Sequence, residues 1–295
     1  MNDSYHVWHH SQTANGGRHV IGYTACPRER KNDENNETKK WPDAIGIGVP
    51  KAGTGTLSFL DCHPDVAYRD HEPNMFMRNR VHYDLADYRL PLTSSYLIEK
   101  SPFYSRLLAA GDVRQRVRAI IGQKPRVKIF IFIRDPIKRL VSHFSMCKRE
   151  LFSYCQDMAI DEFFDHVTYY ITTNSTASSM PEFIREYVHY GNYGDIIDEV
   201  MDETDSIHIA DGEMLKEDPL SEYSLLFDYF GLSVAPLEWR FNEEKGQHCL
   251  YRPVKFCLDA MKGHQPTVQL SRVRPNCKSI VTFVDQKPHV QKVTR

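Results

Sequence analysis

Several common signatures are missing from this chain of 295 residues, and each absence disfavours a class of protein. No run of about 18 apolar residues occurs, so we expect no membrane span. The first residues are polar and lack the apolar core of a signal peptide, so no anchor is visible in the chain. No Cys-x-x-Cys pair occurs, which disfavours a zinc ribbon or a thioredoxin-like site. We also find no internal repeat.

An excess of either charge is missing too. The chain has 37 Lys and Arg against 39 Asp and Glu, a net charge of −2, so no nucleic-acid partner is expected. Hydrophobic residues make up 41% of the chain, which is enough for a sizeable core. Residues 28–40 are dense in charge and Asn without periodicity, and we predict that residues 1–42 are irregular or disordered.

Seven cysteines are present, and four of them form two pairs with the same spacing. Cys147 and Cys155 are eight residues apart, as are Cys249 and Cys257. Such a gap can close a hairpin disulfide in an oxidising compartment, or the residues can be buried thiols. Spacing alone leaves both interpretations open.

From residue 43 onward, strand patterns alternate with helical patterns. We predict strands at 44–49, 96–99, 127–133 and 206–210, and helices at 57–60, 137–148 and 220–230. Gly231 suits the end of the last helix, and Pro136 suits a first helical turn. This alternation predicts an α/β fold with a central parallel sheet flanked by helices. Ligands of such sheets bind beyond the carboxyl ends of the strands.

A glycine-containing loop at residues 50–56 follows the first of these strands. A loop of this kind before a helix offers backbone N–H groups and a positive dipole to an anion. Lys51 adds a charge, while Thr54 stands where a P-loop NTPase would carry its lysine. The loop therefore favours a phosphate or sulfate ligand over ATP in a nucleotide kinase. A purely structural glycine turn is the alternative.

The pattern Pro50-Lys51-x-Gly53-Thr54-x-x-Leu57 resembles the 5′-phosphosulfate loop of sulfotransferases. These enzymes take a sulfuryl group from 3′-phosphoadenosine-5′-phosphosulfate (PAPS). Residues 49–76 are similar to the heparan sulfate sulfotransferases, and especially to the glucosaminyl 3-O-sulfotransferases. The similarity continues in ordered blocks at 99–104, 133–142, 207–212 and 249–263. It implies a P-loop-like sulfotransferase domain over residues 43–266, followed by a divergent tail at 267–295.

The resemblance implies a role for each motif. Glu72 would be the general base, while Lys51 and Lys100 would stabilise charge around the transferring group. Arg134 and Ser142 would bind the 3′-phosphate, which distinguishes PAPS from ATP. Further donor-binding positions would be Gly53, Thr54, Gly55, Thr56, Lys262 and Gly263. The glycan would meet Arg69, Asn74 and Arg78, although a solvated surface is an equal alternative for the two arginines. Cys249 and Cys257 match the family's hairpin disulfide, and no metal is required.

Three departures from the family pattern bear on the acceptor and on closure over PAPS. Asn74 stands where the 3-O enzymes place His. Gly55 stands where the 3-O enzymes tend to carry Arg, and in this feature the loop resembles N-sulfotransferase domains more. The arginine expected after Gly263 is missing. We therefore predict PAPS-dependent sulfation of a glucosamine in heparan sulfate, at the 3-hydroxyl. N-sulfation is one alternative. The other is a non-catalytic homologue that binds a glycan or 3′-phosphoadenosine-5′-phosphate (PAP), the nucleotide that remains after PAPS has lost its sulfuryl group. A small-phenol sulfotransferase is disfavoured because those enzymes usually employ a His base. The family implies the Golgi lumen.

Overall fold

The computed structural model describes residues 37–39, 41–69, 72, 74, 76, 89–91, 95–107, 110–149, 153–173, 181–234, 236–244, 246–253 and 257. Most of the segment predicted to be irregular, and all of the tail at 267–295, lie outside these ranges. Within the first segment the structure differs from the prediction at one place. Strand β1 (Glu37–Lys39) pairs antiparallel with β4 (Arg89–Pro91), a partner too distant in the chain for local patterning to reveal.

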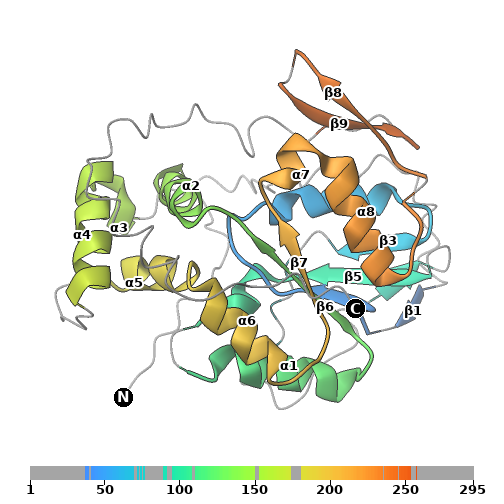
Figure 1. Ribbon diagram of the computed structural model, residues 1–295, viewed down its shortest axis with the longest axis horizontal. Coiled ribbons are helices and arrows are strands. Elements are labelled where there is room, and N and C mark those ends of the chain that lie inside the picture. Colours follow the sequence, from blue (N-terminus) through green and yellow to red (C-terminus); the bar gives the residue numbers. More distant parts are fainter. Residues whose placement is uncertain are drawn as a thin grey trace, which may run out of the picture.

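Five parallel strands form the central sheet, in the order β3-β5-β2-β6-β7 (Figure 1). Their bounds are Ala44–Gly46 for β2, Val66–Arg69 for β3, Tyr96–Lys100 for β5, Lys128–Ile133 for β6 and Ile207–Asp211 for β7. Every neighbouring pair runs parallel, which confirms the predicted α/β fold. The carboxyl ends of all five strands therefore lie along one edge of the sheet.

Strand β6 lies next to the middle of this sheet, and its sequence shows why. Ile129, Phe130, Ile131 and Phe132 are all completely buried, as a parallel strand covered on both faces requires. Gly46 of β2 lies opposite Phe130, and a Cβ at this glycine would come within 2.7 Å of the Phe130 ring. Ladder bonds continue past β2, from Val49 N to Phe132 O at 2.9 Å, in keeping with the strand predicted at 44–49.

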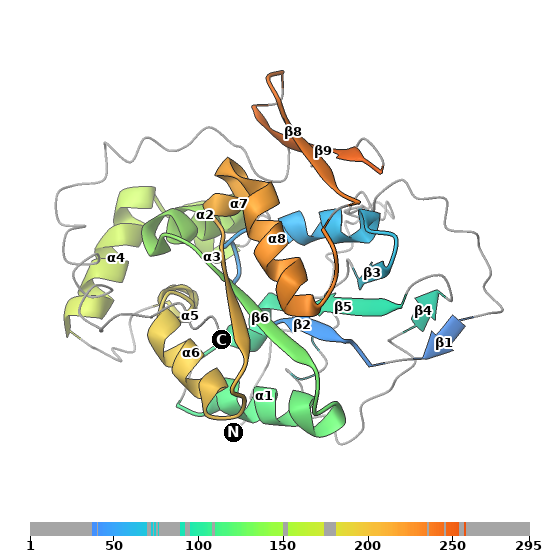
Figure 2. The same cartoon turned by 45° about the vertical axis from the view of Figure 1, so that its right-hand side comes forward.

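Helices cover both faces of the sheet. Helices α1 (Asp112–Gln123) and α6 (Tyr193–Met201) lie on one face, and η1 (Thr54–Cys62) and α8 (Pro219–Phe230) lie on the other (Figures 1 and 2). Helix α8 begins after Asp218, whose side chain accepts from Ser221 N, and it ends at Gly231 with φ 75°. Both signals confirm the predicted helix. The helix predicted at 57–60 is a 3-10 helix and begins earlier, at Thr54.

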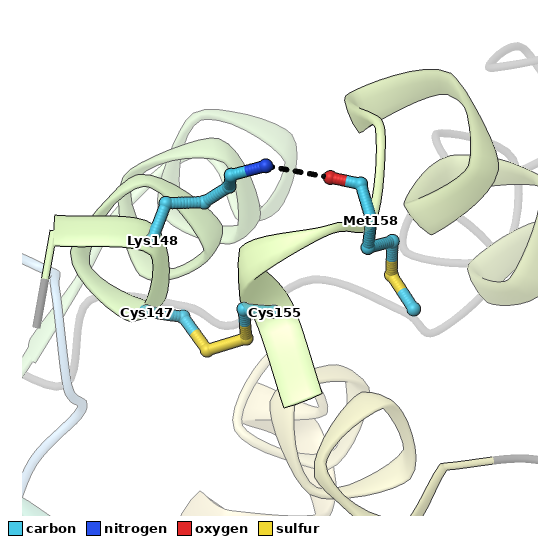
Figure 3. The surroundings of a disulfide bond; sticks show 4 residues. All are labelled: Cys147, Lys148, Cys155 and Met158. Atoms are coloured by element: carbon cyan, nitrogen blue, oxygen red, sulfur yellow. Dashed lines mark hydrogen bonds between the residues drawn. A yellow bond between two sulfur atoms is a disulfide. The ribbon is translucent and has the colours of Figure 1, made fainter. Parts of the chain in front are cut away.

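A second hydrophobic core lies beyond the carboxyl end of β6, to one side of the sheet (Figure 2). It is built by α2 (Pro136–Arg149), α3 (Ser153–Gln156), α4 (Ile160–Thr173) and α5 (Glu182–His189). A disulfide joins Cys147 of α2 to Cys155 of α3, and Lys148 Nζ donates to Met158 O at 2.9 Å (Figure 3). These contacts hold α2, which leaves β6 directly, against its neighbours.

The last described elements form a hairpin that packs on η1. Strands β8 (Glu238–Asn242) and β9 (Gln247–Arg252) pair antiparallel, and Cys249 forms a disulfide with Cys257. Trp239 contacts Phe59 edge to face, with ring centroids 4.4 Å apart. Two short helices, η4 (Pro102–Ser105) and α7 (Met214–Glu217), follow β5 and β7. Both cysteine pairs with the eight-residue gap are thus disulfides.

Candidate active site

The loop after β2 has a backbone shape set by its own residues. Lys51 has φ 70° and Gly53 has φ 105°, both in the left-handed region, which glycine adopts most easily. Thr56 donates to Gly53 O twice, from its backbone N and from Oγ1, each at 2.9 Å. Tyr223 of α8 donates its hydroxyl to Thr56 O at 2.7 Å. The loop that the sequence predicts to bind an anion is therefore held both internally and by α8.

Gly212 locks this loop against the ends of β6 and β7. Its N–H donates to Ile133 O at 2.8 Å, which extends the pairing of the two strands. A Cβ at Gly212 would lie only 2.0 Å from Ala52 O, so no other residue fits between the loop and β7 without movement. Gly53 is close as well, because its Cβ would meet Gly212 Cα at 3.6 Å. The loop therefore lies directly over the carboxyl ends of the central strands.

Lys100 ends β5 and forms an ion pair with Glu72. Its Nζ lies 2.7 Å from Glu72 Oε1, and the two side chains are 3% and 24% exposed. A buried ammonium group needs such a partner, because desolvation of an unpaired charge is costly. Strand register places Lys100 opposite Gly46, only a few residues before the loop. The structure thus brings Glu72 and Lys100 together beside the loop that carries Lys51.

Asn74 lies next to this pair. Its N–H donates to Ser101 Oγ at 3.1 Å, and its side-chain Nδ2 donates to Glu72 O at 3.1 Å. Its Oδ1 atom is buried and accepts no hydrogen bond from the described residues. A buried carbonyl oxygen without a donor is costly, so this atom suits a donor group on a ligand.

Cations gather around one carboxylate at the ends of β6 and β7. Glu213 accepts from Arg134 Nε at 2.5 Å and from Lys138 Nζ at 3.1 Å. Burial alone would raise the pKa of Glu213, but the hydrogen bonds from Arg134 and Lys138 outweigh it and lower this pKa. Burial, reinforced by the charge of Arg134, lowers the pKa of Lys216 nearby. Three cations, Arg134, Lys138 and Lys216, thus lie close together at this end of the sheet, as a binding site for an anionic ligand requires.

Helix α2 borders the same region. His143 on this helix is buried, and its pKa lies well below the usual value because of burial and the charges of Arg139 and Lys51. His143 is therefore neutral, and the charge of Lys51 reaches α2. Ser142, predicted to share the 3′-phosphate with Arg134, is a half-buried residue of this helix.

Several predicted site residues lie outside what the structure describes. Arg78, Lys262 and Gly263 are in such segments, and for Arg69 only the backbone position at the end of β3 is described. Thr54 is buried at the start of η1, while Gly55 is exposed. A Cβ at position 55 would meet nothing within 4 Å, so the backbone there is not closely covered by other residues.

The sequence did not mark Gly212, Glu213 or Lys138 as site residues. Gly212 and Lys138 lie within blocks of family similarity, which is the one signal that could have marked them. Their packing and pairing depend on β6 and β7 being neighbours, which no local pattern states. Among the described residues no three His, Cys, Asp or Glu side chains gather as metal ligands. The helices that the structure describes are all too short or too polar to cross a bilayer.

Most of the chain is similar to known proteins. The family model described as Sulfotransferase domain matches residues 42–256. Heparan sulfate glucosamine 3-O-sulfotransferase 3B1 of Homo sapiens is 28% identical over 253 residues, which are 80% of this chain and 60% of that protein. Heparan sulfate glucosamine 3-O-sulfotransferase 6 of Mus musculus is 29% identical over 240 residues, covering 76% of this chain and 64% of that one. The chain thus spans about 60% of the length of these curated relatives.

A solved structure shows the same fold. The sulfotransferase from Alicyclobacillus acidocaldarius superposes with a TM-score of 0.55 at 16% sequence identity. The match covers 82% of this chain and 91% of that one. At this level of identity the similarity concerns the arrangement of strands and helices.

Proposed function

Because this chain belongs to the sulfotransferase domain family, we propose that it transfers a sulfuryl group from PAPS to a glucosamine residue of heparan sulfate, at the 3-hydroxyl. The pair of Glu72 and Lys100 carries the proposal, since it places a carboxylate base and a buried cation beside the loop of Lys51. The names of the relatives support the acceptor and its position.

The donor-binding residues fit PAPS in their chemistry. Gly53 caps η1, and Thr54, Gly55 and Thr56 form the first turn of this helix, whose N-terminus suits the 5′-phosphosulfate. The cation cluster around Glu213 suits the 3′-phosphate, because Arg134 uses Nε for the carboxylate and keeps its terminal nitrogens for a second anion. Ser142 would add a hydroxyl donor. Lys262 and Gly263 are proposed to close over the donor.

In-line transfer requires a base on one side of sulfur and positive charge on the other. We assign the base to Glu72, which accepts the proton of the acceptor hydroxyl as the new S–O bond forms. Its Oε2 atom has no hydrogen-bond partner among the described residues, whereas Oε1 accepts from Lys100. Lys51 and Lys100 stabilise the charge that collects on the transferring group and on the leaving phosphate as the old S–O bond breaks.

Acceptor contacts are assigned to Arg69, Asn74 and Arg78. The buried Oδ1 atom of Asn74 supports this for one of the three, because a sugar hydroxyl or amine could donate to it. Since both disulfides suit an oxidising compartment, a Golgi lumen location accords with the proposal.

Transfer of radiolabelled sulfate from PAPS to heparan sulfate, followed by disaccharide analysis, tests the proposal. We expect 3-O-sulfated disaccharides from the parent and a rate lower by a factor of about 10²–10⁴ for Glu72→Gln. The matched control is Glu162→Gln, an exposed residue in the first turn of α4 that should retain full activity. N-sulfated products would refute the 3-hydroxyl assignment. Binding of PAP without transfer to any glycan would favour the non-catalytic alternative.

A further inference from the structure

A second carboxylate lies behind the proposed base. Glu99 precedes Lys100 in β5 and is completely buried. Its Oε1 atom accepts two hydrogen bonds from hydroxyl groups, one from Ser101 Oγ at 2.7 Å and one from Tyr104 Oη at 2.9 Å. Both donors lie just beyond the end of the strand, in or beside η4.

The same two hydroxyl oxygens also accept hydrogen bonds from the segment that carries Glu72. Asn74 N donates to Ser101 Oγ at 3.1 Å, and Phe76 N donates to Tyr104 Oη at 3.4 Å. A hydroxyl has one proton to donate and lone pairs with which to accept. Two chains of hydrogen bonds, here called relays, therefore end on Glu99. In each relay a backbone N–H donates to a hydroxyl oxygen, and that hydroxyl donates to the Glu99 carboxylate.

We propose that Glu99 is a positioning residue, which acts through Ser101 and Tyr104 to hold the backbone at Asn74 and Phe76, so that the nearby Glu72 carboxylate stays paired with Lys100. The role as base rests on the proposed function, but the relay itself does not. Two relays of different length hold the backbone at alternate residues, 74 and 76, so the segment cannot slide or tilt without breaking one of them.

The chemistry of the relay supports this role. Burial, followed by the negative charge of Glu99, raises the pKa of Tyr104 well above its usual value, so this hydroxyl stays protonated and donates. Hydrogen bonds that end on a buried charge are shorter and stronger than neutral ones. The side-chain amide of Asn74 also donates to Glu72 O, which links the anchored backbone to the base itself.

Tyr104→Phe and Ser101→Ala each remove one relay and leave most of the packing in place. Tyr229→Phe is the matched control, because its hydroxyl also donates to a buried backbone oxygen, Ile129 O at 3.0 Å, at the opposite end of the sheet. For each variant we would measure kcat and KM for PAPS, the melting temperature, and hydrogen exchange of the amides of Asn74 and Phe76.

We expect Tyr104→Phe to lower kcat by about 10- to 100-fold, since a misplacement near 1 Å has effects of that size. KM for PAPS should stay within about twofold, and exchange at Phe76 should accelerate, as exchange at Asn74 should in Ser101→Ala. Glu99→Gln keeps an acceptor oxygen and should retain more activity than Glu99→Leu. Tyr229→Phe should leave kcat and the exchange at both amides unchanged.

Wild-type kcat and unchanged amide exchange in both relay variants would overturn the proposal. Variants that lose only melting temperature, to the same extent as Tyr229→Phe, would also overturn it, because a merely structural role predicts that result. If the parent protein transfers no sulfuryl group at all, the proposed function fails. Amide exchange at Asn74 and Phe76 would still decide whether Glu99 positions the segment.

Discussion

Gly212→Ala tests how closely the loop at residues 50–56, here called the anion loop after its predicted ligand, is packed against the strand ends. The added Cβ would lie 2.0 Å from Ala52 O and 3.0 Å from Ile133 O, and contacts under 3.0 Å are essentially never seen. The loop and β7 must then separate by about 1 Å, and both obstacles are backbone atoms that cannot rotate away. The φ angle of Gly212 is not positive, so this clash is the main cost.

Overpacking of this kind destabilises a protein by about 1–3 kcal/mol. Because the displaced atoms belong to the loop of Lys51 and Gly53, we also expect the affinity for PAP to fall at least about tenfold. Urea unfolding would measure the free energy of unfolding, and isothermal titration calorimetry would measure PAP binding.

Gly122→Ala provides the matched control. Gly122 lies in α1, and a Cβ there would meet nothing within 4 Å. Alanine is better than glycine inside a helix by about 0.5–1 kcal/mol, so the same chemical change should stabilise the protein here. Equal stability and equal PAP affinity for Gly212→Ala and the parent would refute the reasoning, since the loop would then yield without cost.

Two further predictions concern charge. Arg134→Ala should weaken binding of PAP by more than about tenfold. Binding of adenosine 5′-phosphate should stay nearly unchanged, because only PAP carries a 3′-phosphate. Equal losses of affinity for both nucleotides in calorimetry would contradict this role of Arg134. Burial lowers the pKa of His208 to about 4, so folding favours its neutral form, and its contribution to stability is lost as the pH falls from about 6.5 to 4. That pKa shift corresponds to at most about 3 kcal/mol of the free energy of unfolding. In urea unfolding, His208→Phe should therefore make the free energy of unfolding depend less on pH across this range. An unchanged dependence on pH would show that other groups cause the acid sensitivity.

Much of the fold could be predicted from local patterns. The apolar run of β6, the proline at the start of α2, and the glycine at the end of α8 each act through nearby residues, and each was placed within a residue or two. The helix after the anion loop was predicted at the right place but is a 3-10 helix, a distinction that apolar spacing over four residues does not carry. Strand β1 was missed because its only signal is a distant partner.

The candidate site divides in the same way. The sequence by itself determined which chemical groups are present, namely the anion loop with Lys51 and the motifs carrying Glu72, Lys100 and Arg134, because these motifs lie in continuous segments. Only the tertiary structure decided that Glu72 forms an ion pair with Lys100 and that Glu213 forms one with Arg134. Hydrogen bonds and ion pairs act over about 3 Å in space, and strand order, which local patterning does not specify, determines which distant segments come that close.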